Sequence, residues 1–236
     1  DHSGTITGNL DVELQGTHST TEDFMGTGTI NHLILNGSGL SVDIGRDTTL
    51  GNLTITQGTL HTNASSSFAL TVTGNTVVDA TLTGNNSTFT FGTDGVHGST
   101  EGGCLLVNTS GTFTFGSGDV TIFSGFTAKG TDTVTSTGGG DIIIKGRTNN
   151  GFMNSHSHQG VSITGDYIID YDNNSIFDNR GGTRIICGTF IIKHGGRTYE
   201  PWNNSGVALF RIVGNMDIQN GTFDTEYSGQ SSQNLT

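Results

Sequence analysis

The sequence predicts an all-β chain folded as a parallel β-solenoid, or β-helix, of about ten rungs. A pentad recurs along its 236 residues: a glycine, a small polar residue, then apolar residues at alternate positions. This pattern is typical of a turn followed by a strand that buries one face. Successive copies start 20 to 26 residues apart, except for one interval of 44, which we interpret as two steps of 22. A strand-turn unit returning at this period indicates a solenoid. The copies start at Gly8, Gly28, Gly51, Gly74, Gly118, Gly140, Gly165, Gly188 and Gly214.

The scarcity of proline and the lack of helical patterns agree with this fold class. The chain has one proline, Pro201, and proline removes a donor from a sheet ladder. No stretch of eleven or more residues shows the apolar spacing of an amphipathic helix. We therefore expect strands and turns throughout.

Charge is distributed unevenly along the chain. The net charge is −12, and residues 1–128 contain a single base, Arg46, among many acids. An acidic surface repels phosphate backbones, which disfavours nucleic-acid binding. No apolar run approaches the length of about 20 residues that spans a bilayer. The missing initiator methionine and signal peptide favour a segment of a longer chain.

We expect one domain, residues 1–236, with two parts. Residues 1–128 contain acidic, regular rungs in which Thr and Ser alternate with apolar residues, and their hydroxyls could form ladders between rungs. Residues 129–236 are richer in Ile and Lys or Arg. Longer polar loops interrupt this part at 147–159, 171–182 and 195–206, and loops of solenoids usually carry the binding function.

Two cysteines, Cys104 and Cys187, are separated by 83 residues, which is not a whole number of rungs. A disulfide needs its two Cα atoms within about 7 Å. We therefore interpret both as buried free thiols that act as small hydrophobes.

A run of acids and amides follows one predicted strand of the second part: Asp170, Asp172, Asn174 and Asp178. Oxygen ligands at alternate positions suit Ca²⁺, although Ser175 stands where an EF-hand loop requires glycine. Turns capped by Asx side chains explain the same residues. A divalent metal here is one hypothesis, and no other cofactor is expected.

The same acids could instead be catalytic. Asp170 and Asp172 could share a strand face, with Arg180 or Arg184 nearby to stabilise an anionic transition state. The sequence places no second carboxylate across a groove from them. We therefore expect a non-enzymatic protein, with a polysaccharide lyase or hydrolase as the alternative.

The only tryptophan lies in the segment Tyr199-Glu-Pro-Trp202-Asn203. An exposed Trp flanked by Tyr and Asn could stack on a sugar ring or on a neighbouring subunit. Alternatively, the indole ring of Trp202 covers the end of a rung. Tyr199, Trp202 and Asn203 are the candidate residues for contact with a carbohydrate or a partner.

Three repeat phrases carry a resemblance: Leu53-Thr-Ile-Thr-Gln-Gly-Thr-Leu, Leu70-Thr-Val-Thr-Gly-Asn and Gly111-Thr-Phe-Thr-Phe-Gly. They resemble repeats of large β-helical surface proteins, namely virion appendage and tail proteins of marine phages and secreted adhesins similar to filamentous haemagglutinin. The resemblance covers residues 50–125 and weakens after residue 160. It implies a non-enzymatic role in an extracellular assembly or in receptor contact, often as a trimer or within a long filament.

The pair His156 and His158 adds a second metal hypothesis. Alternate residues of an extended segment point the same way, so a three-fold assembly would bring six imidazoles around one axis. This arrangement resembles the His-x-His sites of trimeric phage tail fibres. The alternative is a solvated polar loop.

These observations predict a structural module of a phage or viral surface appendage, such as a tail fibre, spike or capsid fibre, that contacts host glycans. A secreted bacterial adhesin and a polysaccharide-degrading tailspike are the alternatives. We expect an extracellular or virion-surface location. We also expect a homo-oligomer, preferably a trimer, or contact with other virion proteins.

Overall fold

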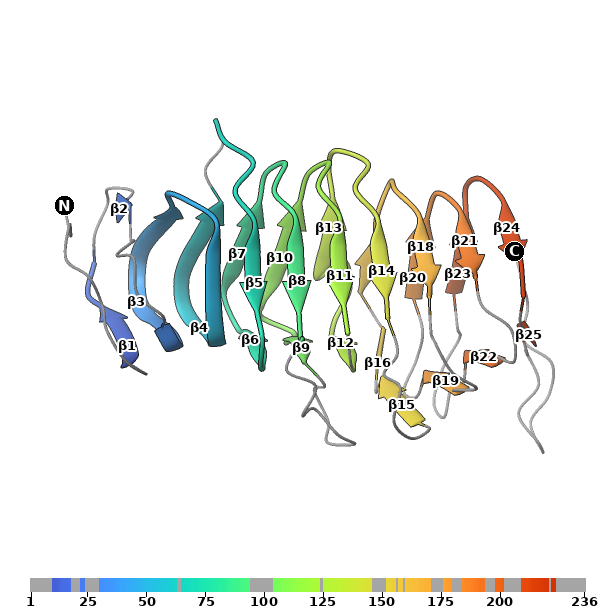
Figure 1. The fold of residues 1–236 in the computed structure, drawn as a ribbon, viewed down its shortest axis with the longest axis horizontal. Helices are drawn as coiled ribbons and strands as arrows, with labels where there is room; N and C mark the ends of the chain where they lie inside the picture. Colours follow the sequence, from blue (N-terminus) through green and yellow to red (C-terminus); the bar gives the residue numbers. More distant parts are fainter. Residues whose placement is uncertain are drawn as a thin grey trace.

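The chain winds around a single axis as a coil of parallel strands (Figure 1). The computed structural model describes residues 10–17, 22–23, 30–62, 65–93, 104–123, 125–145, 152–155, 157–158, 160–170, 176–179, 184–193, 198–201, 209–220 and 222–223. Within these ranges there are strands and turns and no helix. The predicted all-β parallel solenoid is confirmed.

Three columns of paired strands form the coil, and we name them faces 1, 2 and 3. Face 1 contains β5 (Leu70–Val72), β8 (Phe89–Phe91), β11 (Val120–Ile122), β14 (Ile142–Ile144), β18 (Tyr167–Ile169), β21 (Phe190–Ile192) and β24 (Met216–Ile218). Face 2 contains β6 (Thr76–Val78), β9 (Leu105–Val107), β12 (Phe126–Ala128) and β16 (Ser157–His158). Face 3 contains β7 (Thr81–Gly84), β10 (Thr112–Phe115), β13 (Val134–Ser136), β17 (Val161–Ser162), β20 (Arg184–Cys187) and β23 (Leu209–Ile212).

Long strands form the N-terminal end of the coil instead of separate short ones. They are β3 (Ile30–Ile44) and β4 (Thr48–Thr62), and β1 (Leu10–Gln15) and the two-residue β2 (Glu22–Asp23) precede them. β4 pairs with β5, β6 and β7, so one strand runs along all three faces. The coil has about six turns, which is fewer than the ten rungs predicted. The prediction took each pentad as the start of one more rung, although pentads precede strands of more than one face.

The interval of 44 residues was also misinterpreted. Gly74 precedes β6 on face 2, whereas Gly118 precedes β11 on face 1. The chain between them passes through one full turn and two further strands, not through two turns. A pentad can precede a strand of face 1 or of face 2, because the pattern requires only a turn followed by a half-buried strand.

A second parallel sheet lies along the lower edge of the C-terminal half (Figure 1). Its four strands are β15 (Phe152–Ser155), β19 (Ile176–Asn179), β22 (Thr198–Pro201) and β25 (Thr222–Phe223). The sequence predicted three polar loops where β15, β19 and β22 lie, so that prediction is wrong for these residues. Insertions at equivalent points of successive turns lie side by side, and their backbones can then form ladder hydrogen bonds whatever their side chains.

The core is a set of side-chain columns that run along the coil. One column on face 1 joins Leu10 in β1 to Ile218 in β24 through eight intermediate residues, and each of these eight is at most 5% exposed. The intermediate residues are Ile30, Leu50, Val72, Phe91, Ile122, Ile144, Ile169 and Ile192. Each turn therefore buries its apolar side chains against the turns before and after it.

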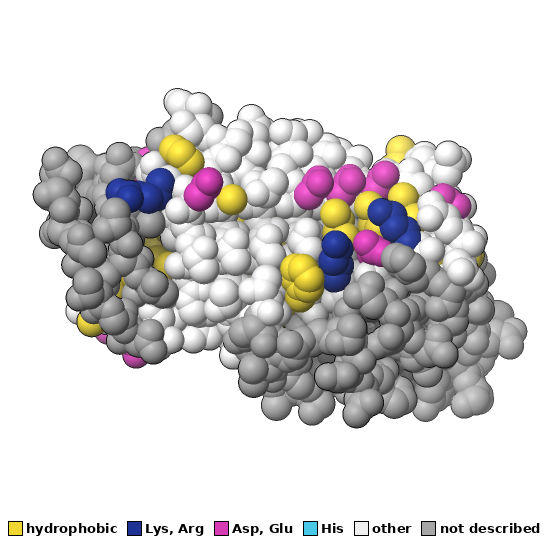
Figure 2. Space-filling view, viewed as in Figure 1, with side chains coloured by type: hydrophobic (Ala, Val, Ile, Leu, Met, Phe, Trp, Pro, Cys, Tyr) yellow, Lys and Arg dark blue, Asp and Glu magenta, His cyan; other side chains and the backbone are white. Residues whose placement is uncertain are grey.

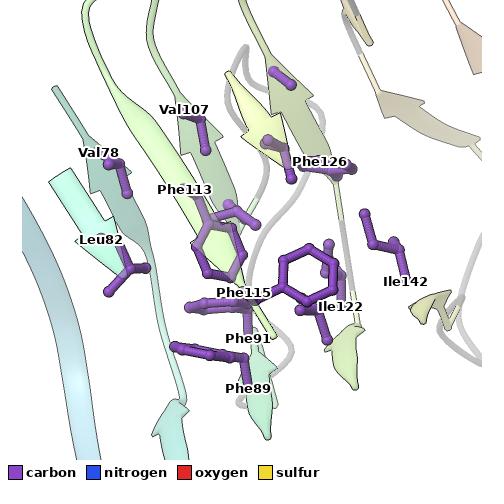
Figure 3. Packing of buried hydrophobic residues seen from close by; sticks show 14 of the residues in the cluster. Val78, Leu82, Phe89, Phe91, Val107, Phe113, Phe115, Ile122, Phe126 and Ile142 are labelled. Atoms are coloured by element: carbon purple, nitrogen blue, oxygen red, sulfur yellow. The ribbon is translucent and has the colours of Figure 1, made fainter. Parts of the chain in front are cut away.

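Aromatic rings fill the middle of the coil (Figure 3). The ring of Phe113 lies 5.0 Å from that of Phe89 and 6.0 Å from that of Phe91, both edge to face. Phe115 lies 5.5 Å from Phe113. Edge-to-face pairs at these distances are favourable beyond the area they bury. The Phe-x-Phe strands of faces 1 and 3 thus meet inside the coil.

Threonine hydroxyls outside the core form the predicted ladders. Thr114 and Thr135 on face 3 are joined by a hydrogen bond of 3.0 Å between their Oγ1 atoms. The hydroxyl of Thr112 donates to Thr81 at 3.5 Å. The first of these contacts has the usual hydrogen-bond length, and the second is at its limit.

Both cysteines are buried free thiols, as predicted. Burial, with the negative charge of Asp166 as a lesser cause, raises the pKa of Cys187 to about 12. This thiol therefore stays protonated in the folded protein over the whole physiological range, and its contribution is packing.

Candidate functional site

Face 1 changes character along the axis of the coil. Its N-terminal half is mostly uncharged, whereas charged and hydrophobic side chains gather over its C-terminal half (Figure 2). Three acids on successive turns, Asp119, Asp141 and Asp166, each precede a strand of this face, β11, β14 and β18 respectively. We call them the aspartate row.

Each carboxylate of the aspartate row accepts a hydrogen bond from the backbone of the next turn. Asp119 Oδ1 accepts from the N–H of Asp141 at 3.1 Å, and Asp141 Oδ1 accepts from the N–H of Asp166 at 2.8 Å. Asp166 Oδ1 accepts from the N–H of Thr189 at 2.9 Å. The row thus satisfies backbone donors at turns that would otherwise depend on water.

The pKa of Asp141, the middle member of the aspartate row, is raised above its ordinary value. Partial burial is the largest cause, and the carboxylates of Asp119 and Asp166 also raise this pKa. The N–H of Asp166 and the charge of Lys193 act in the opposite direction. The row is therefore a strip of negative potential whose middle member binds a proton more readily than an isolated aspartate.

The outward-facing column in the middle of face 1 changes from Thr to Ile. Along β4, β5, β8 and β11 it consists of Thr49, Thr71, Thr90 and Thr121. Along β14, β18 and β21 it consists of Ile143, Ile168 and Ile191. Ile168 is only 5% exposed although it lies on the outer side of the strand. An apolar strip therefore runs beside the aspartate row.

Asp170 lies between two lysines at the other end of these strands. Lys145 follows β14, Asp170 follows β18, and Lys193 follows β21. Their N–H groups donate to the preceding turn at 2.7, 2.8 and 3.0 Å, which places them at equivalent positions. The Nζ atom of Lys145 lies 6.0 Å from the centre of the Phe123 ring, the outer limit of a cation–π contact. This surface could bind a partner that combines apolar and charged groups.

Most of the predicted site residues lie outside the described part of the chain. His156, Asp172, Asn174, Trp202 and Asn203 belong to this group, as does Arg180. The metal and carbohydrate hypotheses that rest on them stay predictions.

Three predicted site residues lie on strands. His158 in β16 pairs with Ala128 of β12. Asp178 in β19 occupies the same register position as Asn154 in β15 and Glu200 in β22. Tyr199 in β22 pairs with Phe177 of β19 and Phe223 of β25. The second sheet therefore brings Asp178 and Tyr199 to neighbouring strands, which the sequence did not predict.

Arg184, proposed as a helper of Asp170 in catalysis, has another partner. Its guanidinium forms an ion pair with the carboxylate of Asp132. Arg184 begins β20 on face 3, whereas Asp170 follows β18 on face 1. This ion pair joins the arginine to the turn before β13.

No group of three or more His, Cys, Asp or Glu side chains close enough to hold a metal ion occurs among the residues that the structure describes. The aspartate row and the isoleucine column were not predicted as a site. A signal was present for both: Asp follows the glycine in three successive pentads, and Ile replaces Thr at the middle of the strand.

Comparison with family models, curated proteins and solved structures found no match to this chain. Over its described residues, no helix has the length and apolar character needed to cross a bilayer.

Proposed function

We propose that this chain is a structural module of an extracellular surface appendage, such as a phage tail fibre, spike or capsid fibre, and that its C-terminal half contacts host glycans. The observation that carries the proposal is the face 1 column from Leu10 to Ile218. One continuous core along the whole coil makes a rod that resists bending. The polar ladders outside it hold each turn to the next.

Contact with a partner is assigned to the C-terminal half because its surface differs from that of the regular turns. Asp141 and Asp166 of the aspartate row, the isoleucine column and the lysines beside Asp170 lie on face 1 of this half. The second sheet, whose strand β22 includes Tyr199, belongs to the same half. Sugar rings bind surfaces that combine an apolar or aromatic patch with polar groups. The proposal includes assembly of several copies, with a trimer preferred.

The test is binding of the labelled full chain to host cells and to an array of surface polysaccharides. We expect saturable binding without release of reducing ends. Tyr199→Ala and Trp202→Ala should weaken binding at least tenfold, whereas Thr90→Ala on the regular turns should not. Failure to bind any glycan or cell, or equal binding by all variants, would contradict the proposal.

The same experiment separates the alternatives. Turnover of a polysaccharide that is lost in Asp170→Asn and Asp172→Asn would indicate a degrading enzyme instead. An antibody raised against the chain should label purified virions if it belongs to an appendage. Labelling confined to bacterial cells and their shed material would indicate an adhesin.

A further inference from the structure

The outer row of face 3 contains two acids and a histidine in the first turns, where later turns have hydroxyls. β2 and the C-terminal parts of β3 and β4 continue this face beyond β7 towards the N-terminus. Asp23 pairs with Asp43, and Asp43 pairs with His61. The row then continues through Thr83, Thr114, Thr135 and Ser162. Ionisable groups thus replace hydroxyls on three successive strands.

Asp43 and His61 lie on the outer side of the coil. Both side chains are partly exposed, whereas the residues before and after each of them are at most 4% exposed. Asp23 is placed in the row by its backbone register with Asp43, because its side chain lies outside the described part. A solute can therefore reach the row directly from solvent.

Two acids at directly opposite positions of paired strands repel each other. Asp23 and Asp43 have this arrangement, and like charges so placed destabilise a sheet. The later turns avoid the cost, because hydroxyls such as those of Thr114 and Thr135 donate hydrogen bonds to one another. Ionised carboxylates only accept hydrogen bonds, so a cation is needed to join one to the next.

The donor set of the row suits zinc. Imidazole favours Zn²⁺ over Mg²⁺ and Ca²⁺, and carboxylates supply the negative charge. Ligand atoms lie about 2.0–2.2 Å from a tetrahedral Zn²⁺ and therefore about 3.4 Å from one another. Neighbouring strands are about 4.8 Å apart, so short side chains on successive strands can meet at one ion.

We propose that Asp23, Asp43 and His61 bind one Zn²⁺ on the outer row of face 3, with a water molecule as the fourth ligand. In the first turns the ion takes the place of the hydroxyl hydrogen bonds that join later turns, and it fastens β2 to the coil. The inference goes beyond the proposed appendage and does not depend on glycan binding.

The test is titration of the metal-free full chain with Zn²⁺ by isothermal titration calorimetry. The wild-type chain should show a tight site for one ion. Asp23→Asn, Asp43→Asn and His61→Ala should each weaken that site by about tenfold or more, since even groups that only support a metal ligand are worth this much.

Two matched controls remove the same kinds of group elsewhere. His32→Ala removes an imidazole that is hydrogen-bonded to Thr54 at 2.9 Å, and Asp47→Asn changes a carboxylate that accepts from the N–H of Ala69 at 2.8 Å. Both should bind Zn²⁺ as the wild-type chain does. Circular dichroism checks that every variant is folded.

Thermal melting gives a second readout. Zn²⁺ should raise the melting temperature of the wild-type chain and of both controls, because it binds the folded state, but not that of His61→Ala. Excess Ca²⁺ should not displace the ion, since imidazole disfavours hard cations.

Absence of Zn²⁺ binding by the wild-type chain would overturn the inference, and so would equal binding by all variants. Binding that is lost in His158→Ala but kept in His61→Ala would place the metal at the other predicted histidine pair and would also overturn it. Displacement by Ca²⁺ would contradict an imidazole ligand. None of these results would alter the outcome of the glycan-binding test.

Discussion

The turns from β5 to β13 and the turns from β14 to β24 bury the same positions but present different surfaces. In the first region Phe113 packs among other Phe rings, and Thr90 and Thr121 face outward. In the second region Ile144 and Ile169 form the core, and Ile143 and Ile168 face outward. Both regions place apolar residues at the inward-facing positions of each strand, so the coil continues unchanged from one to the other. The outward-facing residues do not take part in this core, and their identity can therefore differ. This separation between core and surface is the basis on which we propose that the second region contacts a partner.

The largest expected effect tests the core of the first region. Phe113→Ala removes a ring that contacts three other Phe rings, and the free energy of unfolding should fall by about 3–5 kcal/mol. Ile144→Ala in the second region should cost about 2–5 kcal/mol, toward the lower end because its side chain is smaller. Urea unfolding measures both. A larger loss in Ile144→Ala would show that ring packing adds nothing.

The second effect concerns how tightly the turns approach one another. A Cβ added at Gly111 would overlap the carbonyl oxygen of Val78, whereas a Cβ at Gly188 would lie 2.9 Å from the oxygen of Thr164. Gly111→Ala should therefore destabilise the protein by about 1–3 kcal/mol, and more than Gly188→Ala does. Thr112→Ala, an exposed neighbour, serves as the control. Equal melting temperatures of the two glycine variants would contradict the difference in spacing.

The third effect is a pH dependence contributed by the second region. The pKa of Cys187 is raised to about 12, so the unfolded chain releases this proton at lower pH than the folded protein does. Stability should therefore be unaffected by this thiol below about pH 9 and decrease as the pH rises above it, by at most about 1.4 kcal/mol per pH unit.

Unfolding of the wild-type chain and of Cys187→Ala between about pH 8 and about pH 11 measures this slope. The variant should show the shallower slope, whatever its absolute stability. Rapid labelling of the thiol by a disulfide reagent in the folded protein would contradict the burial on which the prediction rests.

The smallest effect concerns the aspartate row. Burial and two neighbouring acids raise the pKa of Asp141, so its contribution to stability is greatest at low pH and is lost as the pH rises through that pKa. Asp141→Asn removes the repulsion and leaves an Oδ1 atom that can still accept from Asp166. We expect a gain of up to about 1 kcal/mol at neutral pH, because solvent screens half-exposed charges.

Thermal melting from about pH 3 to about pH 7 measures this effect, and Asp119→Asn, at the end of the row, should gain less. A loss of stability at neutral pH in Asp141→Asn would show that the negative charge itself strengthens the hydrogen bond to the next turn.

The sequence by itself determined the fold class and the positions of many strands. Apolar alternation after Gly118, Gly140 and Gly188 correctly located β11, β14 and β21, because a strand with one buried face needs a period of two whatever surrounds it. The threonine ladders were predicted for the same local reason. The absence of a disulfide between Cys104 and Cys187 was predicted from their separation along the chain, which is not a whole number of repeats.

Only the tertiary structure decided how these strands stack. The number of turns, the change of face between Gly74 and Gly118, and the second sheet depend on which residues become neighbours one turn later. So does the alignment of Asp119, Asp141 and Asp166 into one row. Spacing along the chain does not determine that alignment, because turns of different length can bring equivalent positions together. The alternation of buried and exposed residues is determined within each strand, whereas a column of side chains depends on how successive turns of the coil align.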